Sequence, residues 1–543
     1  MKTKHAGQRV AALAMAALCA SAFSPSGTGA RPDQDSETAT PIKHIVVIFQ
    51  ENVSFDHYFA TYPHATNPGG EPAFHAKDDT PRVNNLESSG LLTRNPNSFR
   101  PLNPAGANPF RIDRSNALTC DQDHNYGDEQ FAADGGLMDR FTAKLPSGKP
   151  FSCNDANIGP NSVMGYFDGN TVTAMWNYAQ HFAMSDNSFG TGFGPSTPGL
   201  LNLVAGNTYA GQVTKGTGPG FIAGGGTFGA VIGDGDPGGD NCSSPTRTQI
   251  TMTGKNIGDL LNEAGITWGS FMGGFANCAA AHTGLTGANS VDYIPHHAFF
   301  QYWQSTLNPT HVGPSSPAMI GRTDRANHEY DINDFWTAVN NHSLPAVSFL
   351  KAPAFEDGHA GYSDPLDEQN FLVNTINKLE QTEEWKETAI VVLYDDSDGW
   401  YDHVLGPIVM QSNLSDSNPT NEDQLLGPGN CGTATAAPGT QTVENGRCGV
   451  GPRLPLLVIS PWARKNYVDH RVTDQSSVIR FIEENWNLPN IGNGSTDIIT
   501  GRINGMFDFD DRDVSGRRLI LDPLSGLVVS SDSDRDGGKG KNQ

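Results

Sequence analysis

The chain has 543 residues, of which 37% are hydrophobic and 9% aromatic, and its formal net charge is −24. This length exceeds what one compact core usually organises, so we expect one large domain with sizeable insertions, or two domains. The acidic balance argues against a nucleic-acid partner, because phosphate backbones are bound by clustered Lys and Arg side chains.

The first residues are typical of a secretory signal. Lys2, Lys4 and Arg9 form a basic start, residues 10–17 are apolar and rich in Ala, and small residues follow at 20–22. We therefore predict a signal peptide over residues 1–30 and an exported protein, either periplasmic or secreted. After removal of this leader, no other segment is long and apolar enough to form an integral membrane span.

The cysteine count supports export. Removal of the leader leaves six cysteines, and an even number in an exported chain favours disulfides over metal ligation. The local pairs that the spacing makes plausible are Cys431 with Cys448 and Cys120 with Cys153, although sequence does not determine the connectivity.

Apolar runs alternate with helical patterns along the chain, which predicts an α/β fold with a mostly parallel sheet between helices. The runs are continuously apolar, as expected for strands buried on both faces. The predicted strands cover 45–49, 266–268, 347–350, 389–394 and 454–459, and the predicted helices 257–264, 371–379 and 476–486. We expect one domain over 41–525 with long loop insertions at 63–115, 206–250 and 410–452, followed by a mobile polar tail over 526–543.

Acidic and amide side chains follow the predicted strands where they end. Glu51 and Asn52 follow the first run, Asp395 and Asp396 follow the run at 389–394, and His359 lies within ten residues of the run at 347–350. In open α/β sheets ligands bind outside the carboxyl ends of the strands, so we expect a metal or phosphate site there. Adjacent carboxylates at a buried strand end also require a neutralising cation. The alternatives are a helix cap at Glu51 and Asn52 and an acidic turn at Asp395 and Asp396.

A turn punctuated by Gly and Pro over 190–199 leads into a helical pattern that begins near Ser196. A hydroxyl at a helix N-terminus lies where backbone N–H groups favour an anion, which suits a nucleophile that accepts a phosphoryl group. The alternative is that Ser196 or Thr197 is an ordinary N-cap. The chain has no convincing GxSxG element, which argues against an α/β-hydrolase esterase.

Four histidines are candidates for the same site: His124, His296, His297 and His359. A single histidine is more often a core or surface residue than a ligand. The adjacent pair at 296–297, beside aromatic residues, is harder to explain in that way.

Six longer motifs surround these candidate residues. They are ENVSFDHYFATYP at 51–63, MGYFDGNTVTAMWNYAQ at 164–180, SDNSFGTGFGPSTPGLLNLVAG at 185–206, DGHAGYSDP at 357–365, YDDSDGWYDHV at 394–404 and GPRLPLLVISPWA at 451–463. With these motifs the chain resembles the bacterial phosphoesterase family that contains acid phosphatases and phospholipases C. The resemblance implies an alkaline-phosphatase-like fold with Ser196 as nucleophile and a divalent metal ion, of unspecified identity, on Glu51, Asn52, Asp395 and Asp396. It also implies that Asn52, His124 and His296 bind the substrate and that His297 or His359 protonates the leaving group.

The function implied by this resemblance is that of an exported metal-dependent phosphoric ester hydrolase with a phosphoseryl intermediate. The intact GPSTPGLLNLVAG segment and the pair His296 and His297 favour the acid-phosphatase-like branch, and a phospholipase C acting on phospholipid diesters is the alternative. The turn DDSDG departs from the DEHGG and DENDG forms common in the family. A catalytically silent binding protein is disfavoured because every expected site residue is present, and a sulfatase because GPSTPG lacks the required Arg.

Overall fold

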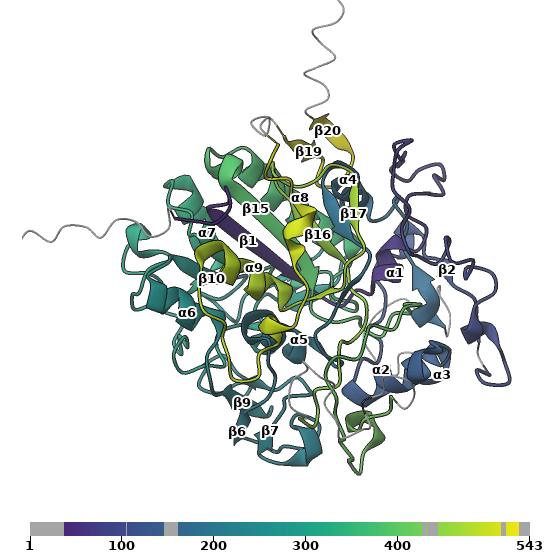
Figure 1. Ribbon diagram of the computed structural model, residues 1–543, viewed down its shortest axis with the longest axis horizontal. Helices are drawn as coiled ribbons and strands as arrows, with labels where there is room; N and C mark the ends of the chain where they lie inside the picture. The colour runs from purple at the N-terminus through teal and green to yellow at the C-terminus, as the bar shows by residue number, and fades with distance from the viewer. Residues whose placement is uncertain are drawn as a thin grey trace, which may run out of the picture. The chain divides into compact units, whose positions relative to one another are not determined.

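The computed structural model describes residues 37–104, 106–145, 161–425, 431, 444–511 and 517–531. An eight-stranded sheet forms the centre of this part of the chain, with β1, β15 and β16 side by side (Figure 1). Its strands, in spatial order, are β13 (Glu329–Asp331), β10 (Trp268–Met272), β14 (Val347–Lys351), β1 (His44–Gln50), β15 (Thr388–Tyr394), β16 (Leu456–Ile459), β4 (Ala183–Ser185) and β17 (Tyr467–Asp469). Within this sheet only β16 runs antiparallel to its neighbours, so the predicted α/β class with a mostly parallel sheet is confirmed.

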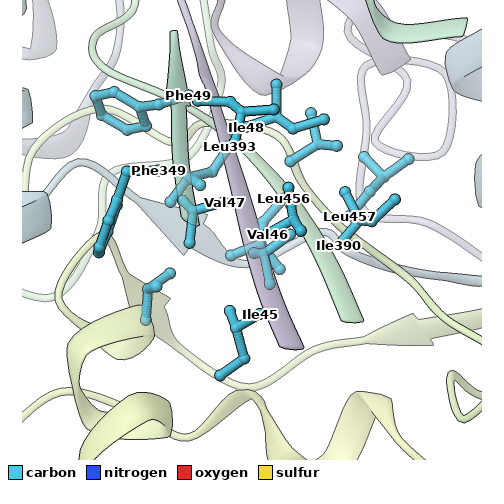
Figure 2. Packing of buried hydrophobic residues seen from close by; sticks show 14 of the residues in the cluster. Ile45, Val46, Val47, Ile48, Phe49, Phe349, Ile390, Leu393, Leu456 and Leu457 are labelled. Atoms are coloured by element: carbon cyan, nitrogen blue, oxygen red, sulfur yellow. The ribbon is translucent and has the colours of Figure 1, made fainter. Parts of the chain in front are cut away.

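The core of the sheet lies along β1 and its neighbours. Val47 of β1 pairs with Phe349 of β14 on one side and with Val391 of β15 on the other. Successive residues of β1 and β15 are buried although their side chains alternate between the two faces, so both faces are covered. Figure 2 shows how the side chains of β1 pack with those of the adjacent strands.

The predicted helices at 257–264, 371–379 and 476–486 are present as α6 (Ile257–Ala264), α8 (Pro365–Glu380) and α9 (Ser477–Trp486). A capping box between Asn256 and Asp259 starts α6, and Asp364 caps the N-terminus of α8. Two further helices are α4 (Thr173–His181) and α5 (Ser196–Ala205): α5 contacts α6 and α9, while α4 contacts α8.

Three parts of the fold differ from expectation. The strand expected at 266–268 begins only at Trp268, and the expected loop at 206–250 contributes a second, four-stranded sheet. That sheet consists of β6 (Gly211–Lys215), β7 (Phe228–Gly229), β8 (Asp236–Pro237) and β9 (Gln249–Met252). Near the C-terminus β19 (Leu519–Leu521) pairs with β20 (Val528–Ser531), so residues 526–531 belong to the fold rather than to the expected tail.

The sequence also predicts disulfides and no integral membrane span after the leader. Cys431 and Cys448 are bonded as expected, and Cys242 is bonded to Cys278. The expected partner of Cys120, Cys153, lies outside the described residues, as do the signal segment 1–30 and residues 532–543. None of the described helices has the length and hydrophobicity needed to span a bilayer.

Candidate active site

Two adjacent strands deliver the candidate metal ligands. Glu51 and Asn52 follow β1, and Asp395 and Asp396 follow its neighbour β15, and all four side chains are buried. Asn52 has a left-handed backbone with φ of 58°, which an Asn tolerates, and its N–H donates to Asp395 Oδ1 at 2.9 Å. The two strand ends are therefore held together by this bond, and the sequence-predicted ligands form one cluster.

Ser196 is the first residue of α5, and its hydroxyl lies inside this cluster. Its Oγ is 3.2 Å from Glu51 Oε2 and 3.2 Å from Asp396 Oδ2. Gly199 makes this approach possible, since a Cβ added there would lie 2.3 Å from the carbonyl oxygen of Asp395. The first turn of the helix thus packs directly on the backbone of the second carboxylate pair.

We expect Gly199→Ala to lower kcat by about a hundredfold, because the added methyl group must move α5 and its serine away from Asp396. Steady-state kinetics measures this loss. Gly192→Ala is the matched control: its nearest neighbour would be Cys448 O at 3.5 Å, an ordinary contact, and activity should remain. Equal activity of Gly199→Ala and the wild type would contradict the role given to this close packing.

Two buried oxygen atoms in the cluster lack hydrogen-bond partners among the described residues, namely Asn52 Oδ1 and Asp395 Oδ2. Burial raises the pKa of Glu51, and the charge of Asp395 raises it further. The pKa of Asp396 is raised by the same two causes. Buried carboxylate and amide oxygens with excess negative charge fit a hard divalent cation, so the residues present suit the expected metal ion.

Lys351, the last residue of β14, is a fully buried cation that sequence reasoning missed. Its ammonium group contacts Glu51 Oε1. Burial lowers the pKa of Lys351, but the charges of Glu51, Asp395 and Asp357 outweigh that effect and the net shift is upward. A lysine that ends an otherwise apolar strand was the only signal in the sequence.

The histidines at 297 and 359 lie next to the cluster with their rings 6.4 Å apart. His297 Nδ1 is 3.0 Å from Glu51 Oε1, and His359 Nδ1 is 2.6 Å from the carbonyl oxygen of Ala360. Because a carbonyl oxygen only accepts, Nδ1 of His359 carries a proton and Nε2 remains for other partners. Burial lowers the pKa of His297 well below its usual value and that of His359 to about 4.

The other two predicted histidines contact acidic residues around the cluster. His124 Nδ1 is 3.3 Å from Asp398 Oδ1, and that same oxygen accepts from Asn52 Nδ2 at 3.1 Å. His296 is partly exposed and its Nδ1 lies 3.5 Å from Asp236 Oδ1, in the second sheet. The structure therefore brings all nine predicted site residues into one connected region.

Glu129, which had no signal in the sequence, links the nucleophile turn to the acidic turn. Its carboxylate accepts from the N–H of Gly194 at 2.9 Å and from the hydroxyl of Ser397 at 2.6 Å. Burial raises the pKa of Glu129 to about 8, although both hydrogen bonds act in the opposite direction. Ser397 is the middle residue of the DDSDG turn, which differs from the forms common in the family. In this chain the Ser397 side chain is held by its hydrogen bond to Glu129.

The family model that matches the chain is described as "Phosphoesterase family" and aligns with residues 42–489. The chain belongs to this family. The resemblance stated from the motifs is thereby confirmed, and the match includes all nine predicted site residues.

Curated relatives of this family member carry phospholipase names. A non-hemolytic phospholipase C of Pseudomonas aeruginosa is 26% identical over 460 residues, which cover 83% of this chain and 55% of that protein. Phospholipase C B of Mycobacterium tuberculosis is 24% identical over 467 residues, which cover 83% of this chain and 74% of that protein. The chain thus spans little more than half the length of the first of these relatives. A solved structure from Vibrio parahaemolyticus, of a protein in the alkaline phosphatase superfamily, matches at 13% identity over 64% of this chain and 67% of that one, with a TM-score of 0.27.

A buried arginine ties together three of the family motifs outside the nucleophile turn. Arg453 is fully buried, with Nε 3.1 Å from Asp402 Oδ1 and Nη2 3.2 Å from Asp56 Oδ1. Its guanidinium also lies over the ring of Phe55 at 4.3 Å from the centroid. Asp56 lies in the segment after β1 that carries Glu51, and Asp402 lies in the segment after β15 that carries Asp396. The contacts of Arg453 therefore support both segments that carry candidate metal ligands.

Proposed function

We propose that this phosphoesterase family member is a metal-dependent phosphoric ester hydrolase that uses Ser196 as its nucleophile. The observation that carries the proposal is the position of Ser196 Oγ, 3.2 Å from both Glu51 Oε2 and Asp396 Oδ2 at a helix N-terminus. An ordinary N-cap hydroxyl bonds to the backbone of its own helix, whereas this one is directed at carboxylates from two other segments.

The residues that would hold a divalent cation are Glu51, Asn52, Asp395 and Asp396. The oxygens Asn52 Oδ1 and Asp395 Oδ2, which have no hydrogen-bond partner in the part of the chain that the structure describes, support this assignment. When bound there, the cation would supply Lewis-acid stabilisation of the phosphoryl group and lower the pKa of the serine hydroxyl. The identity of the metal ion is left open.

The protein's own groups account for the remaining chemistry. Ser196 Oγ attacks phosphorus, the bond to the leaving oxygen breaks, and a phosphoseryl group forms that water later cleaves. Asn52 and the surrounding histidines stabilise charge on the phosphoryl oxygens. His359 would give the leaving oxygen a proton from Nε2 only as the doubly protonated ring, because its Nδ1 proton is held on Ala360 O and burial, which lowers its pKa to about 4, favours the neutral ring. His297 is the alternative acid.

The substrate class has two candidates. The names of the curated relatives favour a phosphodiester of the phospholipase C type over the monoester that the sequence alone favoured. The observation in favour of a monoester is the concentration of cationic and donor groups at the site, with Lys351 and the histidines close to one another. These groups would suit the extra negative charge of a monoester.

Export is the compartment we propose. The bonds Cys242–Cys278 and Cys431–Cys448 support it, because structural disulfides persist in oxidising compartments. The polar, acidic composition offers no argument for a nucleic-acid partner.

The purified chain is expected to hydrolyse p-nitrophenyl phosphate or p-nitrophenylphosphorylcholine, and to lose this activity after chelation because the carboxylate cluster then lacks its cation. Release of p-nitrophenol with and without a chelator measures both points, and re-addition of a divalent ion should restore turnover. A preference for the choline ester identifies the phospholipase C type, and a preference for the monoester the phosphatase type. Full activity in the chelated protein would contradict the proposal.

A further inference from the structure

Three large apolar side chains are exposed on two turns near α2 (Tyr126–Ala133; Figure 1). They are Phe99, Leu102 and Leu137, with exposed fractions of 56%, 49% and 66%. Single exposed apolar side chains are common, whereas a group of them marks a surface that binds a partner. We refer to these three residues as the apolar patch.

Buried amide side chains hold the two turns side by side. Asn97 Nδ2 donates to the carbonyl oxygen of Met138 at 2.8 Å, and Asn103 Nδ2 donates to that of Asp139 at 2.7 Å. Both asparagines are fully buried. In these turns polar side chains are inside and large apolar ones are outside, the reverse of the usual distribution. The exposure of the apolar patch is therefore a defined property of the two turns.

Arginines border the apolar patch, although the chain as a whole has a net charge of −24. Arg100 lies inside the first turn and Arg94 just before it, and both are exposed. Neither forms an ion pair within the described ranges of the chain. The carboxylates near the second turn do not offset them, because Asp134 pairs with Arg140 at 2.8 Å and Asp139 is buried. The patch therefore combines apolar surface with local positive charge.

The apolar patch is connected to the candidate active site through α2. After the second turn, the N–H of Arg140 donates to the carbonyl oxygen of Ala132 in that helix at 3.2 Å. From the same helix, Glu129 accepts from the N–H of Gly194 in the nucleophile turn and from the hydroxyl of Ser397 in the acidic turn. A surface docked on the patch would therefore lie close to the site.

We propose that the apolar patch, together with Arg94 and Arg100, docks the enzyme on the surface of an anionic phospholipid bilayer. The inference rests on the proposed function in its phosphodiester form, because a phospholipid is presented to an enzyme in a bilayer. Exposed Phe and Leu side chains insert at the boundary between headgroups and acyl chains, and arginines beside them attract anionic headgroups. A second copy of the chain fits less well, since a symmetric contact would bring the arginines of both copies together.

The test is sedimentation of the chelated protein with vesicles of phosphatidylcholine, alone or mixed with phosphatidylglycerol. Wild type is expected to bind the mixed vesicles more tightly, and Phe99→Ser/Leu137→Ser to bind them at least about tenfold more weakly, because two apolar side chains no longer enter the bilayer. Leu285→Ser/Val529→Ser is the matched control, since these side chains have exposed fractions of 55% and 65% on other hairpins, and its binding should equal that of the wild type. Arg100→Glu should weaken binding to the mixed vesicles alone.

Four results would overturn the inference: no binding of the wild type, equal binding to both kinds of vesicle, wild-type binding by Phe99→Ser/Leu137→Ser, or the same loss in the control variant. A wild-type dimer that this patch variant converts to a monomer would also overturn it, because the patch would then bind a second copy. Failure of the proposed function is distinguishable, since turnover of p-nitrophenylphosphorylcholine needs no bilayer. The patch variant should keep that turnover, which also shows that it is folded, and absence of turnover in the wild type would contradict the proposed function itself.

Discussion

Replacement of Ser196 by Ala is expected to reduce kcat by at least about a thousandfold, because the nucleophile that forms the covalent intermediate is removed. The cluster itself should survive the change, since Ser196 is small and the carboxylates are held by other contacts, such as Asn52 N to Asp395 Oδ1 at 2.9 Å. The variant should therefore still bind a divalent cation. Steady-state kinetics with both p-nitrophenyl esters, together with metal analysis, measures the two parts of this expectation.

Thr197→Ser is the control for that experiment. Thr197 is the next residue of α5, its N–H donates to Asp234 Oδ1 at 3.0 Å, and its hydroxyl does not contact the carboxylate cluster. Turnover close to wild type is expected. An active Ser196→Ala variant would contradict the assignment of the nucleophile, whereas loss of bound metal in that variant would indicate a damaged site rather than a missing nucleophile.

Arg453→Ala is expected to lower the free energy of unfolding by about 3–5 kcal/mol, because it removes the guanidinium that two buried carboxylates share. Asp56 and Asp402 both contact the guanidinium and are themselves buried. Burial raises the pKa of Asp402 to about 6, because the charged carboxylate is less stable in the interior than in water. Loss of the arginine removes the charge that offsets this desolvation. Denaturant titration followed by fluorescence measures the change.

Arg453→Lys is the matched variant, since it keeps the positive charge but cannot reach both carboxylates and the carbonyl oxygens of Asn84 and Asp186 at once. Its stability should lie between those of the wild type and Arg453→Ala. Because the network supports the turns after β1 and β15, kcat should fall in the same order. Unchanged stability of Arg453→Ala would show that the network does not hold these turns.

The carboxylate and amide residues that sequence reasoning predicted share one property: each pair directly follows an element that could be recognised locally. Glu51 and Asn52 follow an unbroken apolar run, as do Asp395 and Asp396, and parallel strands bring such ends to one edge of a sheet. Ser196 was marked by a turn rich in Gly and Pro before a helical pattern. The fold class followed from the same runs.

The missed residues depend on partners that are distant in the chain. Glu129 lies in α2 (Tyr126–Ala133) and acts through Gly194 and Ser397, and Lys351 acts through Glu51, so no local pattern contains either relation. The direction of β16 was equally hidden, because an apolar run has the same composition in a parallel and an antiparallel strand. Short strands in the Gly-rich insertion pair with one another and lack a long apolar run.

The measurement that tests the central claim most directly is mass spectrometry of the protein quenched in acid during turnover of a p-nitrophenyl ester. Quenching preserves a phosphoserine, and digestion locates it in the chain. The account predicts one phosphate from p-nitrophenyl phosphate, or one phosphorylcholine group from the choline ester, on the peptide that contains Ser196, absent from Ser196→Ala and from the chelated protein. A phosphate on another residue, or none while p-nitrophenol is released in a burst, would contradict it.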